Sequence, residues 1–199
     1  MWQPVDPAWF QGPTLRVARR LLGMVVVHEG PDGITASRIV EVEAYRGPED
    51  RAAHSSGGRL TRRTAVMFGP AGHAYVYQIY GLHFCLNVVT REDGKPEAVL
   101  LRAGEPLQGL PLMAARRRLG SEAPPRLLAS GPARLVQAMG IHRSDYGHPL
   151  WESPLFIAEG HHIARTDIAS GPRIGVDYAG RWAEKPWRFW IRGNPHVSR

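Results

Sequence analysis

Three polar side chains at alternate positions of an apolar run could do chemistry together. The stretch RIVEVEAYRGPED places Glu41, Glu43 and Tyr45 at positions i, i+2 and i+4, which share one face of a strand. Two carboxylates about 7 Å apart on one face repel, so one can hold its proton more tightly unless a cation intervenes. This arrangement suits a general base that activates water. It also fits a solvent-facing strand with two ordinary glutamates.

An aromatic segment is the second candidate for function. The residues from His73 to Thr90 alternate on both sides of Gly81, which predicts a hairpin with its apex near Tyr80. Tyr75 and Tyr77 share one face, where aromatic side chains usually belong to the core. A tyrosine at the apex is harder to bury and could instead insert into a base stack.

A polar segment over residues 47–64 is expected to form a long loop, and such loops are usually functional or disordered. Its sequence HSSGGRLTRRT contains His54, Arg59, Thr61, Arg62 and Arg63. The paired glycines allow a ligand to approach the backbone, and the arginines with Thr61 could hold phosphates. The alternative is a flexible, solvated basic loop.

Other catalytic and metal-binding patterns are absent from the sequence. The nine histidines show no HExxH or comparable ligand spacing, and GxGxxG, P-loop and GxSxG motifs are missing, so neither metal nor cofactor is expected. The single cysteine, Cys85, lies in an apolar strand, which predicts a buried, inert thiol. It excludes an internal disulfide and fits a reducing compartment, so the cytoplasm is the expected location, with nucleoid association if the source is bacterial.

The remaining segments must position these residues. A chain of 199 residues with 43% apolar content can bury one core, so a single domain over residues 1–199 is expected. No apolar run is long enough to span a membrane. The fold class expected is α+β, a single compact mixed domain with a curved, largely antiparallel sheet flanked by helices. Helices are predicted at residues 13–22, 111–119 and 132–139, the last with Ser130 near its N-cap, and strands at 24–29, 35–45, 96–102, 153–159, 173–178 and 187–193 besides the hairpin.

The charge points to a polyanionic partner. The net charge is +7, and Lys95 and Lys185 are the two lysines among 25 cationic side chains, so the others are arginines. Arginine suits planar contact with phosphate, which favours nucleic-acid binding. A genome rich in G and C would also raise the arginine content.

Taken together, these segments resemble the alkyladenine (3-methyladenine) DNA glycosylase family. The matching blocks occur in family order and are RIVEVEAYRGPEDRAAHSSGGRLT, YVYQIYGLHFCLN, AVLLRAGEPL, SGPARLVQA and RIGVDYAGRWAEKPWRFWIRGNP. The resemblance implies a monomeric base-excision-repair enzyme that flips a damaged purine out of double-stranded DNA and hydrolyses its N-glycosidic bond. 3-Methyladenine, 7-methylpurines, hypoxanthine and etheno-adenine are the candidate lesions. No lysine lies near the motif, so no lyase step is expected and the product is an abasic site.

The resemblance also assigns catalytic roles. Departure of the base builds positive charge on the sugar, and a nearby carboxylate stabilises it and can take a proton from water. The motif gives this role to Glu43. Arg102 would hold the water or Glu43, and the main-chain carbonyl of Val176 would contact the water. Glu41 has no assigned role and could tune Glu43 or orient an arginine.

Base and DNA contacts follow from the same motifs. The flipped base would lie between Tyr45 on one side and His54 with Tyr77 on the other, while Asn87 would clash with the exocyclic amine of guanine. Tyr80 would fill the vacated place in the stack. The expected phosphate contacts are Arg59, Thr61 and Arg63. Leu82 and His83, beside Tyr80, depart from the family pattern at a DNA contact.

Two functions from other classes remain open. A non-catalytic protein that binds damaged DNA or RNA could use the same aromatic pocket, although stacking alone needs neither Glu43 nor Arg102. A hydrolase of free nucleosides would leave the basic loop and Tyr80 without a role, and its activity should persist in high salt.

Overall fold

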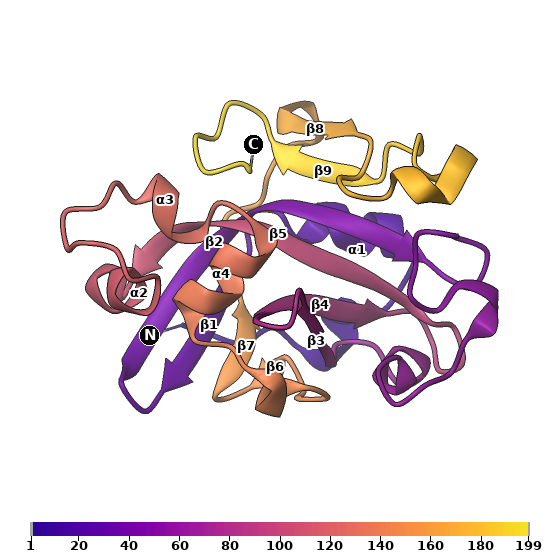
Figure 1. Ribbon diagram of the computed structural model, residues 1–199, viewed down its shortest axis with the longest axis horizontal. Helices are drawn as coiled ribbons and strands as arrows, with labels where there is room; N and C mark the ends of the chain where they lie inside the picture. Colours follow the sequence, from indigo (N-terminus) through magenta and orange to yellow (C-terminus); the bar gives the residue numbers. More distant parts are fainter. Residues whose placement is uncertain (1, 199) are drawn as a thin grey trace.

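The computed structural model describes residues 2–198 and is built around one curved, nine-stranded sheet (Figure 1). Its strand pairings are antiparallel, in the order β3-β4-β5-β2-β1-β7-β6, with β9 added to β2 and β8 added to β9. The strands are β1 (Val25–Gly30), β2 (Gly33–Arg46), β3 (Ala74–Ile79), β4 (His83–Thr90), β5 (Glu97–Gln108), β6 (Trp151–Glu152), β7 (Leu155–Ala158), β8 (Ile168–Gly171) and β9 (Arg188–Ile191). The α-helices are α1 (Thr14–Leu21), α2 (Leu110–Arg116), α3 (Arg126–Ala129) and α4 (Pro132–Met139).

Strand β2 is central because both of its edges are paired along most of its length. One edge pairs with β5, from Ala36 to Arg46. The other edge pairs first with β1, up to Arg38, and then with β9, from Glu41 to Glu43. The register with β5 shifts on both sides of Glu41, where the sheet changes its partner strand. The segment that carries the two glutamates is therefore enclosed by β5 and β9.

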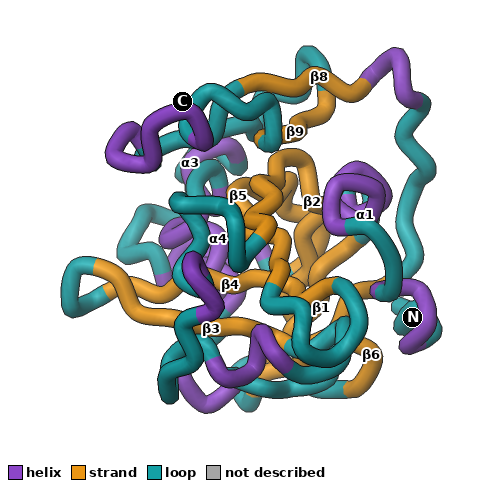
Figure 2. Tube along the Cα trace, turned by 90° about the vertical axis from the view of Figure 1, so that its right-hand side faces the viewer, coloured by secondary structure: helices purple, strands orange, loops and turns teal. Residues whose placement is uncertain are grey.

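Helices cover the sheet from two sides. Figure 2 shows α1 and α4 on opposite sides of β2 and β5, and the β3–β4 hairpin projects on the side of α4. Helix α1 buries Val17 and Leu21 in the main core, and α4 buries Leu135 and Met139 there. Helix α4 has its proline at the first helical position. It ends at Met139 and is capped by Gly140, which adopts the left-handed conformation typical of glycine at a φ of 71°.

These observations confirm the α+β fold class with a curved antiparallel sheet. Helices α1 and α4 and the strand of residues 35–45 lie where the sequence predicts them. The hairpin apex also lies at the predicted place, because Tyr80 and Gly81 connect β3 to β4.

Some local predictions differ from the structure, and some short elements were not predicted. Residues 173–178 form no strand, because Gly175 has a φ of 75° and the amide of Ile174 binds a side chain in place of a neighbouring strand. Strand β5 continues beyond Arg102, since Gly104 allows close approach to Ser37. Ser130 lies next to Gly131, the N-cap of α4, as predicted, but its hydroxyl donates to the carbonyl of Arg126 and does not cap the helix. Strand β8 and the short α3 lack a sequence prediction.

Candidate active site

A cavity of about 350 Å³ opens between the β3–β4 hairpin, the loop after β2 and the segment over residues 174–178. The predicted site residues that line it are Glu43, Tyr45, His54, Arg63, Tyr77, Tyr80, Asn87, Arg102 and Val176. Arg59 and Thr61 do not line it. Residues from widely separated parts of the chain therefore meet here, as the resemblance implies.

Glu43 lies fully buried on the wall of this cavity. Its Oε1 accepts the backbone N–H of Ile174 at 2.7 Å and lies 3.2 Å from Nη1 of Arg102. Its Oε2 accepts the hydroxyl of Tyr45 at 2.8 Å. Each of these partners is a donor, so Glu43 acts only as an acceptor. A carboxylate offers about four acceptor positions, and three are filled, which leaves one for a further donor.

Glu41 is also fully buried but does not line the cavity. Its Oε1 accepts from Nε of Arg102 at 2.9 Å and from Nε of Arg188 at 2.7 Å, and its Oε2 accepts the backbone N–H of Ser198 at 2.7 Å. The interpretation of a solvent-facing strand is therefore wrong for both glutamates. Of the two roles considered for Glu41 in the sequence, its hydrogen bond with Arg102 favours the orientation of an arginine.

The guanidinium of Arg102 thus bridges two carboxylates. Burial alone would lower the pKa of Arg102, but the charges of Glu43 and Glu41 outweigh burial and raise this pKa. Arg102 accordingly stays cationic and offers a fixed positive charge beside Glu43.

Tyr45 forms one side of the cavity and is held from behind by a buried ion pair. Cζ of Arg173 lies 4.7 Å from the centroid of the Tyr45 ring, and Nη2 of Arg173 donates to Oδ1 of Asp50 at 2.9 Å. Both members of the pair are fully buried side chains. Burial and the nearby Glu43 raise the pKa of Tyr45 well above its ordinary value, so its hydroxyl remains a donor. The sequence analysis missed Asp50 and Arg173, because no local pattern relates positions so far apart.

His54 and Tyr77 form the opposite side. The His54 ring stands at 88° to the Tyr77 ring with 4.6 Å between centroids, and its Nδ1 lies 2.8 Å from the hydroxyl of Tyr75. Burial, followed by the positive charge of Arg63, lowers the pKa of His54 to about 4. His54 is therefore a neutral wall at physiological pH. Tyr75, whose position on the same strand face as Tyr77 was visible in the sequence, has a positioning role that was not foreseen.

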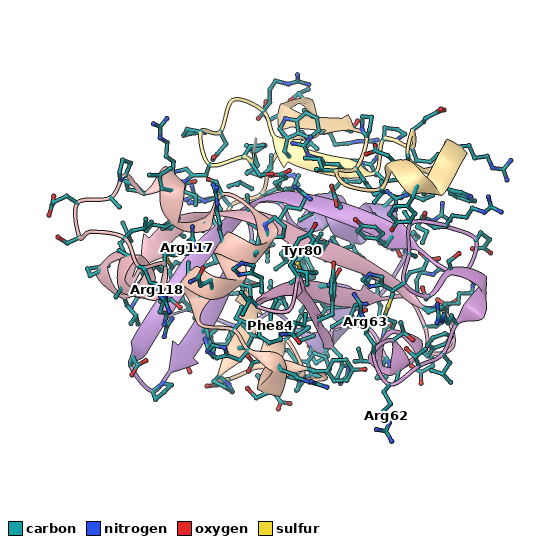
Figure 3. The ribbon with its side chains drawn as sticks, in the orientation of Figure 1. Arg62, Arg63, Tyr80, Phe84, Arg117 and Arg118 are labelled. Carbon is teal, nitrogen blue, oxygen red and sulfur yellow. The ribbon has the colours of Figure 1, made fainter. Side chains whose placement is uncertain are left out.

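Arg63 reaches into this cavity. Its Cζ lies 4.8 Å from the centroid of the Tyr77 ring, and its Nη2 lies 3.1 Å from Nε2 of His54. The adjacent Arg62, by contrast, projects away from the molecule (Figure 3). The neighbouring loop is held by Thr64, which accepts the N–H of Thr61 at 2.9 Å and donates to the carbonyl of Arg59 at 2.8 Å.

Asn87 and Val176 complete the inner part of the cavity. Asn87 is buried, and its Nδ2 donates to the carbonyl of Tyr75 at 3.1 Å, which fixes the orientation of the amide. The carbonyl of Val176 accepts the N–H of Ala179 at 2.9 Å and retains one further lone pair. Both groups are thus held in place by backbone hydrogen bonds.

The hairpin apex is exposed beside the cavity. Tyr80 is 91% exposed and Leu82 is 81% exposed. Tyr80 and Gly81 both have positive φ, 49° and 73°, as in a tight I′ hairpin turn. The left-handed region is unfavourable for a bulky aromatic residue, and packing does not explain an exposed tyrosine here.

The described part of the chain contains neither a metal-binding cluster nor a membrane-crossing helix. Across residues 2–198, no three side chains of His, Cys, Asp or Glu come together as metal ligands. In the same range no helix is long and apolar enough to cross a membrane. Cys85 is buried on the cavity side of β4, and burial raises the pKa of its thiol to about 11.

Comparison with known proteins identifies the family of the chain. The family model for methylpurine-DNA glycosylase matches residues 8–195. A protein of Bacillus licheniformis that bears the name "Putative 3-methyladenine DNA glycosylase" is 48% identical, over 99% of this chain and 97% of its own. Proteins of the same name from Oceanobacillus iheyensis and Bacillus cereus strain G9842 are 44% and 46% identical, over 100% and 97% of this chain and 97% and 98% of theirs. The chain belongs to the methylpurine-DNA glycosylase family. It is accordingly a DNA glycosylase.

Proposed function

We propose that the whole chain forms one domain that removes alkylated purines, 3-methyladenine foremost, from duplex DNA by hydrolysis of the N-glycosidic bond. The observation that carries this proposal is the fully buried carboxylate of Glu43 on the wall of an aromatic cavity, with one acceptor position free. The names of the relatives support 3-methyladenine as a substrate. The protein acts as a monomer.

The reaction uses the free acceptor position of Glu43 for a water molecule. As the purine leaves with the electrons of the C1′–N bond, positive charge builds on the sugar and the nearby carboxylate stabilises it. The water oxygen then bonds to C1′, and its proton passes to Glu43. Arg102 keeps the carboxylate in position, and the second lone pair of the Val176 carbonyl orients the water.

The aromatic walls select and hold the flipped base. A purine alkylated at N3 or N7 is cationic and stacks well between Tyr45 and the rings of His54 and Tyr77. The fixed amide of Asn87 disfavours guanine by contact with its exocyclic amine, so 7-methylguanine should be a poorer substrate than an adenine lesion. Tyr80, exposed at the hairpin apex, enters the duplex where the base has left.

The rest of the DNA is held by charge. Arg59 and Thr61 lie outside the cavity on the neighbouring loop and contact phosphates on either side of the flipped nucleotide. The net charge of +7 favours this partner. No lysine lines the cavity within residues 2–198, so the enzyme is monofunctional and leaves an intact abasic strand.

A base-release panel tests this function. Duplexes that each carry 3-methyladenine, 7-methylguanine, hypoxanthine or etheno-adenine are incubated with the wild type and with Glu43→Gln. We expect the variant to lose at least a factor of about 10² in rate, the usual contribution of a general base, while it still binds lesion duplexes. Glu105→Gln, at a half-buried surface ion pair, is the matched control.

Other outcomes favour the other functions. Release of bases at the wild-type rate by Glu43→Gln would remove Glu43 from the mechanism. Lesion binding without release by the wild type would identify a damage-binding protein. Release from free nucleosides that persists in high salt would identify a nucleoside hydrolase.

A further inference from the structure

The base pocket already contains a planar cation that belongs to the protein itself. The guanidinium of Arg63 lies over the Tyr77 ring, with 4.8 Å between Cζ and the ring centroid. One of its nitrogens lies 3.1 Å from Nε2 of His54. These rings are the ones proposed to hold the flipped purine, so Arg63 occupies contacts that a purine would make.

The contacts around His54 fix the direction of these hydrogen bonds. A guanidinium only donates, so Nε2 of His54 is the acceptor and Nδ1 carries the proton. Nδ1 then donates to the hydroxyl of Tyr75 at 2.8 Å. When Arg63 leaves, Nε2 becomes an open acceptor for an N–H group of an incoming base.

Neutral rings, and not an opposite charge, hold Arg63 in place. The ion pairs among residues 2–198 do not include it, and the nearby carboxylate of Glu43 is occupied by Arg102. A cation–π contact changes an equilibrium constant by a factor of about 2 to 30. Arg63 also retains solvent access. Its position is therefore one that a suitable ligand can take over.

We propose that Arg63 is an exchangeable plug of the base pocket that selects for cationic purines; this inference rests on the function proposed above. A cationic alkylated purine replaces both contacts of the guanidinium, the charge over Tyr77 and the donor to His54. A neutral, undamaged base replaces the stacking but not the charge. Displacement of Arg63 thus costs more for an undamaged base. The released side chain is free to contact a phosphate, as the sequence analysis expects.

The adjacent residue offers a matched control. Arg62 belongs to the same loop and carries the same charge, but it projects away from the molecule (Figure 3) and does not line the cavity that Arg63 lines. Arg62→Ala therefore lowers the charge of the loop without a change in the cavity. Arg63→Ala lowers the charge and removes the guanidinium from the Tyr77 ring. Arg63→Gln retains much of the length but lacks the cation, and guards against a fold defect in the alanine variant.

The first test uses free hypoxanthine, a purine without sugar or phosphate, as an inhibitor of release from a 7-methylguanine duplex. We expect Arg63→Ala and Arg63→Gln to lower the inhibition constant about 5-fold, because both variants lose the cation–π contact with Tyr77 that the base must displace. Arg62→Ala should leave it unchanged. An unchanged inhibition constant in the Arg63 variants would overturn the plug. A raised constant would overturn it as well, since Arg63 would then be a ligand of the base.

The second test concerns selectivity. The ratio of single-turnover rates on 7-methylguanine and hypoxanthine duplexes should fall about 5-fold in both Arg63 variants relative to Arg62→Ala. An equal ratio in all variants would refute selection by charge. If the wild type releases no base at all, the proposed function fails, and calorimetric titration with hypoxanthine still decides whether Arg63 closes the pocket.

Discussion

Nε of Arg102 lies 2.9 Å from Oε1 of Glu41, a carboxylate outside the cavity. The other end of the same guanidinium lies 3.2 Å from Glu43. Glu41 thus fixes the position of Arg102, and in the proposed mechanism it acts on the reaction through that charge. Because the cation of Arg102 lies between the two carboxylates, its attraction to both outweighs their mutual repulsion, and two fully buried glutamates can share one strand.

Replacement of Glu41 by glutamine should impair both stability and catalysis. The change leaves the buried guanidinium of Arg102 and the partly buried one of Arg188 with one carboxylate fewer, which costs about 3–5 kcal/mol of unfolding free energy. Displacement of Arg102 by about 1 Å should lower the single-turnover rate by a factor of up to about 10². Urea unfolding and base release measure the two effects. Glu105→Gln should stay within about 1 kcal/mol of the wild type, and equal behaviour of the two variants would refute the bridge.

Replacement of Tyr45 by phenylalanine should separate stacking from chemistry. The ring stays over Arg173, so the affinity for a lesion duplex should change by less than about 3-fold. The hydroxyl that donates to Glu43 at 2.8 Å is lost, and hydrogen bonds to charged groups contribute about 1.5–3 kcal/mol, so the rate should fall about 10-fold or more. Affinity from fluorescence anisotropy and rate from single-turnover release provide the comparison. A loss of affinity with an unchanged rate would contradict this assignment.

The pKa of His54 should depend on Arg63. Burial and then Arg63 lower it to about 4, so removal of the arginine should raise it. In the folded protein His54 binds fewer protons than in the unfolded chain between about pH 6.5 and 4, so stability is lost as the pH falls through that range. The loss should be smaller in Arg63→Ala. NMR titration of the His54 ring, with His54→Gln for assignment, measures the shift, and a lower pKa in Arg63→Ala would contradict the contact.

Replacement of Asp50 by asparagine should destabilise the wall that carries Tyr45. The variant leaves the fully buried Arg173 without its carboxylate, a change that costs about 3–5 kcal/mol. The midpoint of urea unfolding should fall accordingly. Suppression of the loss by Arg173→Met in the double variant would support the pair, because both charges are then gone. Strict additivity of the two single losses would show that the residues do not interact.

Replacement of Tyr80 by asparagine should separate the role of the hairpin apex from its stability. Asparagine tolerates the left-handed conformation that Tyr80 adopts at φ 49°, so the variant should be as stable as the wild type or more stable, by up to about 1 kcal/mol. Release of bases from duplex DNA should fall, while release from single-stranded DNA should not. Equal losses on both substrates would exclude a role in duplex opening.

Local sequence patterns predicted much of the scaffold. Alternation identified the strand with Glu41 and Glu43, and the repeated aromatics identified the hairpin that carries Tyr77 and Tyr80. These signals lie within a few residues of each other, so they need no knowledge of the tertiary fold. The family resemblance, and not periodicity, connected Glu43 with Arg102 across the chain.

Long-range contacts could not be predicted in the same way. Glu41 accepts hydrogen bonds from Arg188 of β9 and from Ser198, which lie 147 and 157 positions further along the chain, and its burial depends on them. The sequence of residues 173–178 predicts a strand, but the backbone N–H of Ile174 donates to Glu43 and not to a neighbouring strand. The placement of Arg63 over Tyr77 likewise follows from how the loop after β2 folds back on the hairpin.

The partners of Glu41 and Glu43 determine when, during synthesis of the protein, the site can form. The strand that carries both acids leaves the ribosome early, whereas the amides of Ile174 and Ser198 that bind them are translated more than 130 residues later. At a translation rate of about 5–20 residues per second, the partners of these two glutamates follow about 7 to 30 seconds later, and both side chains stay hydrated until then. Nascent chains interrupted before this region cannot assemble the site, so an unfinished copy would not cut bases from the chromosome.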